Sequence, residues 1–378
     1  MDRVLHIVSA WGTGGVERYL YNFSKYIDNY VFDILTLRES NNMPIFDLGK
    51  DSKIYNLPRI DANYFKRTKF RKKQIIEFLK SHEYKIIHFD TTTADTFILA
   101  KAIKKFYPNV KIIMHCHANN VEPPKVILKK IIHYMAKYTL SKYADYYIGV
   151  SKETIKWMYT NEIQKSINST IITCGIETHM FKFNEENRNK IRKKYGLENK
   201  FVIGTVGRFS TQKNIPFIIK IIDEYSKINK KFKFVWVGNG KLMEYAKGEI
   251  EKHNLNDFVD FLGICNNIEE IYSAFDLFVL PSLYEGNPIV VLEAQINGLK
   301  CLLSNKLISA TDLNDSVKFL SIYNVREWID EIEKIRLNPK RINIPTEKLV
   351  PISVEYNAKK LENIYNSLIE ESVKWKEY

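Results

Sequence analysis

Residues 280–294 read Leu-Pro-Ser-Leu-Tyr-Glu-Gly-Asn-Pro-Ile-Val-Val-Leu-Glu-Ala. An apolar run ends at Pro281, a loop with a glutamate and a glycine follows, and the next residues predict a helix over 288–297. Asn287 is a favourable N-cap, and Pro288 is a favourable first helical residue. The stretch therefore predicts a strand, a loop and a helix in sequence, which is the repeating unit of a parallel α/β sheet.

The same alternation of apolar runs and amphipathic stretches recurs along the whole chain. The expected strands are residues 4–10, 31–37, 85–89, 111–116, 145–150, 170–173, 201–207, 232–237, 258–262, 276–281 and 300–304. One sheet of about eleven strands would be unusually large, so we expect two doubly wound α/β domains. They comprise residues 1–178 and 179–355, and residues 356–378 predict a terminal helix able to return to the first domain.

Composition limits the classes of protein and of partner. The chain has 378 residues with a net charge of +13, which favours acidic partners such as phosphates, nucleic acid or anionic lipid. Hydrophobic residues make up 45% and charged residues 27%, which excludes a disordered chain. No apolar run reaches the ~18 residues of a membrane span, and the first residues predict a strand and no signal peptide. The four cysteines are widely spaced, as expected of buried thiols in a reducing cytosol.

The helix expected after Pro288 predicts an anion site. In an open α/β sheet ligands bind beyond the carboxyl ends of the strands, and a helix N-terminus there presents free N–H groups. The candidate donors are the N–H groups of Ile289, Val290 and Val291. Glu285 and Glu293 flank them, and two such carboxylates can each bind hydroxyls at opposite ends of a sugar–diphosphate–nucleoside. The alternative is that both are ordinary solvated charges, but the apolar neighbours of Glu293 speak against it.

Two further loops follow expected strands. Arg208 follows the strand at 201–207, and Lys213 stands at the next helix start, so a guanidinium fork and an ammonium could bind a diphosphate. Surface salt bridges are the alternative. After the first strand, Gly14 and Gly15 predict either a tight turn or a loop that a substrate can approach closely. Glu17 occupies the third glycine position of a dinucleotide fingerprint, so the loop is not one.

The strand at 111–116 ends in His115-Cys116-His117. A histidine at a strand end is a candidate polar contact or proton carrier, and a structural histidine is the alternative. A metal site would need further ligands, and none is evident nearby in the sequence. The chain also contains no Asp-x-Asp pair, which typically holds Mg²⁺ or Mn²⁺ on a nucleotide diphosphate. We therefore expect neither a metal nor another cofactor.

Two basic stretches lie in the first half of the chain. Residues 66–73 hold six cations in eight positions, and residues 125–142 hold five lysines and no acid among apolar residues. A basic amphipathic helix is typical of membrane-surface binding, although it can also be the solvated face of a core helix. Six cations are the candidate contacts with an anionic membrane or an acceptor held there: Lys69, Arg71, Lys72, Lys129, Lys130 and Lys137.

The ordered set of motifs resembles the retaining GT-B glycosyltransferases of family 4, also called group 1. The resemblance spans nearly the whole chain. It rests on Gly14-Gly15-Val16-Glu17, Met114-His115-Cys116-His117, Val150-Ser151-Lys152, Gly175-Ile176-Glu177, Val206-Gly207-Arg208-Phe209 through Lys213, Phe261-Leu262-Gly263 and Glu285-Gly286-Asn287-Pro288 to Glu293. The short ending after Ser304 is more like enzymes of capsule and exopolysaccharide assembly. The resemblance implies two Rossmann-like domains that face a cleft.

The resemblance also implies roles for single residues. Glu285 would contact the donor sugar, Glu293 the nucleoside ribose, and Arg208 with Lys213 the diphosphate. His117 would touch the donor sugar near the reacting centre, with His115 as the alternative. The donor-binding set is then Gly14, Gly15, Arg208, Lys213, Asn287, Pro288, Ile289, Val290 and Glu293, and the catalytic pair is His117 and Glu285.

We therefore expect a metal-independent, retaining glycosyltransferase that uses a nucleotide-sugar, with UDP ahead of GDP. Its acceptor would be a polyprenyl-diphosphate-linked or other saccharide at the inner face of a bacterial membrane, where the enzyme would be cytoplasmic and peripherally bound. One alternative is a nucleotide-sugar epimerase of the same fold. A basic nucleic-acid-binding protein is another, but the cations are not interleaved with an RNA- or DNA-binding motif, so nucleic acid is not expected as a partner.

Overall fold

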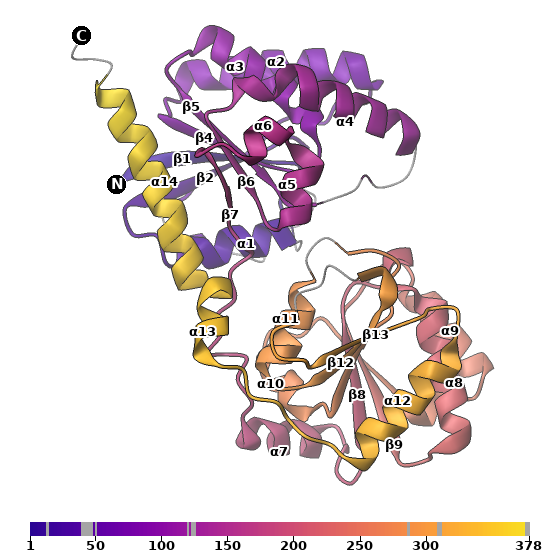
Figure 1. The fold of residues 1–378 in the computed structure, drawn as a ribbon. Helices are drawn as coiled ribbons and strands as arrows, with labels where there is room; N and C mark the ends of the chain where they lie inside the picture. Colours follow the sequence, from indigo (N-terminus) through magenta and orange to yellow (C-terminus); the bar gives the residue numbers. More distant parts are fainter. Residues whose placement is uncertain are drawn as a thin grey trace. The chain divides into compact units, whose positions relative to one another are not determined.

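A computed structural model describes residues 1–12, 15–38, 48–49, 51–118, 121, 126–285, 288–307 and 312–374. The chain divides into two compact units, of which unit 1 is Met1–Gly175 with Pro351–Tyr378 and unit 2 is Ile176–Val350. Each unit is a parallel sheet with helices on both faces (Figure 1). The expected doubly wound α/β architecture is confirmed. The unit boundaries fall after residues 175 and 350, where the sequence suggested 178 and 355.

Unit 1 contains a seven-stranded sheet in the order β3-β2-β1-β4-β5-β6-β7. Its strands are β1 (Asp2–Val8), β2 (Tyr30–Thr36), β3 (Ile54–Asn56), β4 (Ile86–Thr91), β5 (Lys111–Cys116), β6 (Tyr146–Gly149) and β7 (Ser169–Ile171). The chain winds outward from β1 to β3 and then returns to β4 beside β1. The winding direction therefore reverses between β1 and β4, which is where such sheets open to ligands.

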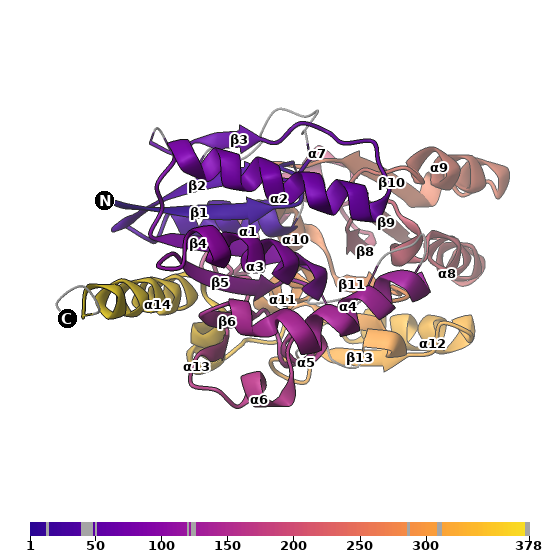
Figure 2. The same cartoon turned by 90° about the horizontal axis from the view of Figure 1, so that it is seen from above.

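Two layers of helices cover the sheet of unit 1. The helices are α1 (Gly15–Ser24), α2 (Tyr64–Ser81), α3 (Phe97–Phe106), α4 (Val126–Leu140), α5 (Lys152–Met158), α6 (Asn161–Gln164) and α14 (Val354–Lys374). Helices α2 to α5 pack on one face, and α1 and α14 on the other (Figures 1 and 2). In β1, Val4 and Val8 face α1 and α14 while Leu5 and Ile7 face the other layer, so the strand is apolar on both sides.

The C-terminal helix α14 belongs to the core of unit 1. Its side chains Leu361, Ile364 and Tyr365 lie in the same apolar cluster as α1 and β1. The expected return of the terminal helix to the first domain is confirmed. It covers a sheet face that α1 alone, with ten residues, would leave partly open.

Unit 2 contains a six-stranded sheet in the order β10-β9-β8-β11-β12-β13. Its strands are β8 (Phe201–Val206), β9 (Phe232–Val237), β10 (Val259–Gly263), β11 (Leu277–Leu280), β12 (Lys300–Ser304) and β13 (Val317–Leu320). Its helices are α7 (Glu185–Lys194), α8 (Ile215–Ile228), α9 (Met243–Lys252), α10 (Ile268–Ala274), α11 (Ile289–Ile296), α12 (Val325–Leu337) and α13 (Thr346–Leu349). Helices α8, α9 and α12 cover one face, and α7, α10 and α11 the other (Figure 1). The winding direction reverses between β8 and β11, so the loops after these two strands are neighbours.

Candidate active site and histidine cluster

The loops after β8 and β11 are held together at the carboxyl edge of the sheet in unit 2. The Leu283 N–H donates to the carbonyl of Gln212 at 2.8 Å, and the Asn214 side chain donates to the carbonyl of Pro281 at 3.2 Å. Asn214 has a φ of 55°, the left-handed conformation that ends one short turn and starts α8. One backbone bond and one side-chain bond to a carbonyl therefore fix these two loops against each other.

Gly207 leaves the space through which Lys213 reaches this edge. A Cβ at residue 207 would lie 2.7 Å from Cε of Lys213, too close for any other amino acid without movement. A Cβ at Gly238, in the loop after β9, would lie 2.1 Å from the carbonyl oxygen of Gly207. A side chain at residue 207 would thus displace the end of Lys213, and backbone crowding against Gly207 requires the glycine at 238.

Lys213 and Glu285 form an ion pair across the two loops. The Nζ of Lys213 lies 2.7 Å from Oε1 of Glu285, and these side chains are only 13% and 10% exposed. The amide of Gln212 donates to the other carboxylate oxygen at 3.0 Å. The structure thus brings together two of the residues predicted to bind the donor, and a third, Gln212, supports the carboxylate.

Arg208 stands at the same edge but differs from Lys213 in its contacts. Its side chain is exposed, and among the described residues it forms no ion pair. A guanidinium in this state is available to an anionic ligand, since no protein carboxylate has to be displaced first.

The N-terminus of α11 differs from the prediction by one residue. Pro288 is the N-cap and Ile289 the first helical residue, whereas we expected Asn287 as the cap and Pro288 inside the helix. The Val291 N–H donates to the carbonyl of Pro288 at 2.9 Å, so it is not free as predicted. This bond spans three residues, as is common in the first turn of a helix. The N–H groups of Ile289 and Val290 have no partner among the described residues; Asn287 lies outside them.

Glu293 is buried on the inner side of α11. It is 4% exposed, and the hydroxyl of Tyr272 on α10 donates to its Oε2 at 2.8 Å. The alternative of a solvated glutamate is therefore wrong. A buried carboxylate held by a hydroxyl is suited to binding hydroxyl groups of a ligand, because each of its oxygens can accept more than one hydrogen bond.

The glycine loop after β1 is described only in part. Gly15 is the first residue of α1, and a Cβ at this position would have no atom within 4 Å. Gly14 lies outside the described residues. Close backbone approach to a substrate remains a prediction for this loop.

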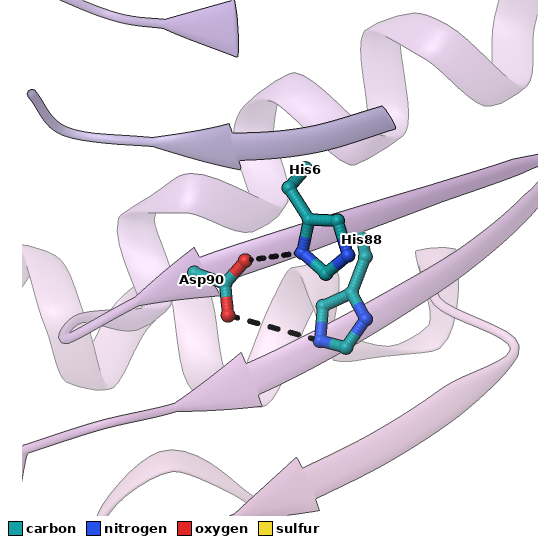
Figure 3. Close-up of side chains that lie close together, drawn as sticks. All are labelled: His6, His88 and Asp90. Atoms are coloured by element: carbon teal, nitrogen blue, oxygen red, sulfur yellow. Dashed lines mark hydrogen bonds and ion pairs between the residues drawn. The ribbon is translucent and has the colours of Figure 1, made fainter. Parts of the chain in front are cut away.

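In unit 1, four histidines and one aspartate gather on the sheet face under α1 and α14. Parallel pairing sets His6 of β1 beside His88 of β4, and Asp90 beside His115 of β5. His6 Nδ1 lies 2.8 Å from Oδ2 of Asp90, and His88 Nε2 lies 3.9 Å from its Oδ1 (Figure 3). His117 Nε2 lies 2.8 Å from Oδ1 of Asp90. Asp90 is thus the centre of the cluster.

The C-terminal helix contributes to the same cluster. The hydroxyl of Tyr365 lies 2.9 Å from Nδ1 of His88 and 3.3 Å from Nε2 of His6. His88 Nε2 lies 3.3 Å from Nδ1 of His115. The ring of Tyr19 from α1 packs edge-on against His115. Three strands and the C-terminal helix, which are distant in sequence, therefore meet through one polar network.

Burial and charge determine the protonation of this cluster. Burial alone would raise the pKa of Asp90, but the surrounding histidines and the bonds from His117 and His6 hold it well below its usual value. Burial lowers the pKa of His88 to about 3 and lowers that of His115 well below the usual range. At neutral pH the cluster thus holds an ionised aspartate beside neutral His88 and His115.

The same side chains could be considered as metal ligands. There are two such groups, one of His6, His88 and Asp90 and one of Asp90, His115 and His117. Within each group the candidate ligand atoms lie within 4.8 Å of one another. However, Asp90 is 2.8 Å from both His6 and His117, which is shorter than the roughly 3.3 Å that separates ligands around a tetrahedral zinc ion. The observed spacing is that of hydrogen bonds with a proton between the two atoms.

The predicted membrane-facing cations divide into two groups. Lys69 and Lys129 are exposed, and Lys72 and Lys130 are half-buried. Arg71 and Lys137 are buried, so their prediction as surface cations is wrong. The Lys137 ammonium donates to the carbonyls of Lys156 and Trp157 at 2.7 and 3.0 Å, and Arg71 donates to the carbonyl of Pro58 at 3.0 Å. Both cations cap carbonyl groups inside unit 1. Among the described residues, no helix is long and apolar enough to cross a bilayer.

Comparison with known proteins identifies the class of the chain. Glycosyltransferase Family 4 matches residues 13–179, and Glycosyl transferases group 1 matches residues 187–347. A sucrose-phosphate synthase from Thermosynechococcus elongatus superimposes with a TM-score of 0.76 at 16% identity, over 98% of this chain and 100% of that one. The HepE protein of Anabaena, solved with UDP and glucose, gives 0.68 at 15% identity over 100% of both chains. The two parallel-sheet units thus have the GT-B glycosyltransferase fold.

The sequence relatives narrow this class to a family. A putative glycosyltransferase EpsF of Bacillus subtilis is 26% identical over 96% of both chains. The UDP-Gal:alpha-D-GlcNAc-diphosphoundecaprenol alpha-1,3-galactosyltransferase of Escherichia coli is 30% identical over 80% of this chain and 79% of that one. The chain belongs to the group 1 glycosyltransferases of family 4, as the resemblance implied.

Several residues of both sites were not predicted from the sequence. In unit 2 they are Gln212 and Tyr272, and in unit 1 they are His6, His88, Asp90 and Tyr365. Gln212 had a weak signal in its place beside Lys213. His6 and His88 are polar residues inside apolar runs, which was a usable signal, but their partners follow only from the strand pairing.

Proposed function

We propose that this glycosyltransferase moves a sugar from a UDP-sugar, with retention of configuration, to a hydroxyl of a lipid-linked saccharide during assembly of a bacterial surface polysaccharide. One observation carries the proposal. Lys213 and Glu285 lie in the loops beside the reversal of the sheet in unit 2, and Arg208 is exposed at the same edge. The N–H groups of Ile289 and Val290, which have no partner in the described part of the chain, follow at the start of α11. Cations and amides there suit a diphosphate, and the carboxylate suits sugar hydroxyls.

The chemistry follows from where charge develops. Cleavage of the glycosidic bond to the diphosphate passes through an oxocarbenium-like state, so negative charge builds on the leaving phosphate. Arg208, Lys213 and the N–H groups of Ile289 and Val290 would stabilise that charge in place. We further propose that Glu285 and His117 contact the transferred sugar and that Glu293 binds the ribose. Departure and attack on one face, with the leaving phosphate accepting the acceptor proton, would need no second catalytic carboxylate of the glycosidase kind.

The names of relatives support the choice of substrates. The Escherichia coli relative is named for UDP-galactose and a diphosphoundecaprenol-linked acceptor, and the HepE structure holds UDP and glucose. UDP is therefore the first donor base to test, and GDP the second. The family and the EpsF and capsule-region relatives support a place in polysaccharide assembly.

Helix α4 supports contact with a membrane surface. It buries polar His133 and Lys137 and exposes a row of apolar side chains: Ile127, Leu128, Ile131, Tyr134, Met135 and Tyr138. Ile127 is 79% and Met135 is 65% exposed, which inverts the usual arrangement of a surface helix. Lys129 is exposed beside this row, and α2 exposes Phe65, Lys69 and Phe70 near its own N-terminus. Both helices begin at the carboxyl end of the sheet (Figure 2). Apolar anchors with cations suit an anionic lipid surface, and we propose peripheral binding to the inner face of the plasma membrane.

We also propose that transfer needs no metal ion, because the chain has no Asp-x-Asp pair and the donor site supplies cations of its own. Transfer activity should then persist in EDTA. Loss of activity with chelator and recovery with Mn²⁺ would overturn this part of the proposal.

The decisive experiment offers the purified protein labelled UDP-sugars together with undecaprenyl-diphosphate-linked saccharides. We expect one UDP-sugar to be transferred, and the anomeric configuration of the product, read by NMR, to match that of the donor. Arg208→Ala should reduce the rate, and Arg326→Ala, which removes an exposed arginine elsewhere in unit 2, should not. A product of inverted configuration would refute retention, and epimerised UDP-sugar without transfer would replace the proposal by an epimerase.

A further inference from the structure

The hydrogen bonds of the cluster in unit 1 determine where its protons lie. Asp90 is ionised and can only accept, so the two nitrogens at 2.8 Å from it, Nδ1 of His6 and Nε2 of His117, must both carry protons. If His6 is neutral with its proton on Nδ1, its Nε2 is an acceptor. The hydroxyl of Tyr365, 3.3 Å away, then donates to His6.

The assignment continues from Tyr365 outward. Because its hydroxyl proton points to His6, its oxygen accepts from Nδ1–H of His88 at 2.9 Å. The Nε2 of neutral His88 then accepts from Nδ1–H of His115 at 3.3 Å. This leaves Nε2 of His115 without a proton, and this buried atom indeed has no hydrogen-bond partner. A bare acceptor costs less there than a buried N–H without an acceptor.

The protons thus form a directed chain from His115 through His88, Tyr365 and His6 to Asp90. The reverse direction would place an N–H on His115 Nε2, in a buried position with no acceptor. The chain has one favourable direction for this reason. His117 is the second donor to Asp90 but stands outside the chain, and its Nδ1 has no partner among the described residues.

We infer that Asp90, with His6 fixed by the Tyr365–His88–His115 chain, is a positioning residue that holds His117 in the Nε2–H tautomer. Its Nδ1 then presents a lone pair, so His117 accepts a hydrogen bond from a substrate hydroxyl and does not act as a proton donor. The inference rests on the proposed function only in the identity of that hydroxyl, which belongs to the transferred sugar or to the acceptor. The tautomer itself is independent of any substrate.

The first test is the wild-type protein labelled with ¹⁵N-histidine, observed by long-range ¹H–¹⁵N NMR at pH 7.5. We expect His6, His88 and His115 to carry the proton on Nδ1 and His117 on Nε2, with each signal assigned from a single His→Gln variant. An Nδ1–H or doubly protonated His117 would overturn the inference. Because this measurement uses the wild-type protein, it does not depend on whether a variant at Asp90 folds.

The second test is Asp90→Asn, which replaces one acceptor oxygen with an amide donor. The amide must face either His6 or His117, and facing His6 would reverse the chain and strand a proton on His115. We therefore expect only His117 to change, from Nε2–H to Nδ1–H, with His6, His88 and His115 as in the wild type. A change at His6 instead would refute the directed chain. Asp33→Asn is the matched control, since it alters another buried carboxylate of the same sheet, bonded to Arg3 and Tyr84.

Activity and ligand binding separate this inference from the proposed function. In Asp90→Asn we expect kcat/KM for sugar transfer to fall roughly 10- to 100-fold, while the affinity of unit 2 for UDP stays unchanged. An altered tautomer with full transfer activity would refute the positioning role. The expected tautomers in a wild-type protein that transfers no sugar would support the proton assignment and refute the proposed function.

Discussion

The Nζ of Lys213 lies 2.7 Å from Oε1 of Glu285, although the two residues follow different strands and stand 72 positions apart. Each neutralises the other while the site holds no donor. A diphosphate that binds Lys213 must compete with Glu285, and sugar hydroxyls that bind Glu285 must compete with Lys213. A complete nucleotide-sugar replaces both halves of the ion pair at once, whereas a fragment replaces only one.

Removal of either cation is expected to weaken donor use. Arg208→Ala and Lys213→Ala each remove a charge-assisted contact worth roughly 1.5–3 kcal/mol, so kcat/KM should fall about 10- to 150-fold. Because both act on one diphosphate, the double variant should lose less than the sum of the single losses. Initial-rate kinetics with a soluble acceptor would measure this. Wild-type turnover in the double variant would contradict the assignment.

The two glutamates are expected to differ in their effect on free UDP. Glu293→Gln should weaken UDP binding, because the ribose would lose a charged acceptor. Glu285→Gln should leave UDP affinity equal or higher, since Lys213 loses its competing partner. The same change should raise the activation barrier of transfer by ~2–4 kcal/mol and so lower kcat. Calorimetry of UDP with each variant separates these outcomes. A large loss of UDP affinity in Glu285→Gln alone would mean that the two ends of the donor are reversed.

Most residues at this edge of unit 2 could be predicted from the sequence because each lies in a local motif, and their roles toward a donor stay predictions. Lys213 follows its strand by a few residues, and Glu285, Ile289 and Glu293 lie within one strand–loop–helix unit. Strands β3 and β13 were missed, since they are short sheet edges of three and four residues that are largely half-buried and carry no apolar run. Which N–H groups of α11 lack a partner among the described residues depends on where the helix begins. Residue preferences predict that position only to within one residue, and here the helix begins one residue later than expected.

The apolar row of α4 is expected to bind anionic vesicles. Each side chain that enters the lipid is worth about 1.5–3 kcal/mol, so Ile127→Ser, Ile131→Ser and Met135→Ser together should reduce vesicle binding at least ~100-fold. Lys129→Gln should cost about 1 kcal/mol more. Flotation with vesicles that contain phosphatidylglycerol measures both.

The control for this prediction is Ile228→Ser, which alters an exposed isoleucine at the end of α8 in unit 2. It should bind vesicles like the wild type. Turnover of a soluble acceptor should stay the same in all these variants. Equal binding by the triple variant and the wild type would make α4 an ordinary solvated helix.

The histidine cluster is expected to make unit 1 sensitive to acid. The pKa of His88 is lowered to about 3 and that of His115 is also lowered, so both take up a proton only on unfolding. Their contribution to stability is complete above pH ~6.5 and falls as the pH falls, by up to about 1.4 kcal/mol per pH unit for each histidine. The lowered pKa of Asp90 adds a loss in the same direction below pH ~4.

Hydrogen exchange of β1 and β4 between pH 7 and 5, corrected for the intrinsic rate, would measure this loss. His88→Gln should reduce the slope by about one proton. His253→Gln, at an exposed position on unit 2, should leave it unchanged. A flat stability of unit 1 over this range would contradict the neutral assignment of the two histidines.

Among the acidic residues of unit 2, replacement of Asp276 is expected to lower the free energy of unfolding most. It binds Arg188 at 2.5 Å, Arg192, and the backbone N–H of Val202 at 2.8 Å, with its side chain 12% exposed. Asp276→Asn leaves two guanidinium groups without their carboxylate and should cost about 3–5 kcal/mol. Asp330→Asn breaks an exposed pair with Arg326 and should cost at most about 0.5 kcal/mol. Urea unfolding followed by hydrogen exchange in β8 compares the two, and equal losses would contradict the expectation.

Only part of the cluster in unit 1 could be predicted from the sequence. His115 and His117 could be predicted because they end one strand, but Asp90 and Tyr365 form their hydrogen bonds with histidines 27 or more positions away. The charge of Lys137 and Arg71 predicts exposure, because charged side chains are normally at the surface, but both are buried. In α4, His133, Ala136 and Lys137 have the i, i+3, i+4 spacing of a buried face, and this spacing was a better indicator than their charge.

The return of α14 to unit 1 has a consequence for biosynthesis. The ribosome releases residues 1–175 and then the whole of unit 2 before it makes Tyr365 and its neighbours. Until then the sheet face that carries His6 and His88 is covered only in part, by α1, and the side chains that pack against α14 are exposed. Unit 1 thus begins first and is completed last, and a nascent chain stalled before Pro351 would present a finished unit 2 tethered to an unfinished unit 1. Such a chain would be a substrate for chaperones, since its exposed face is apolar.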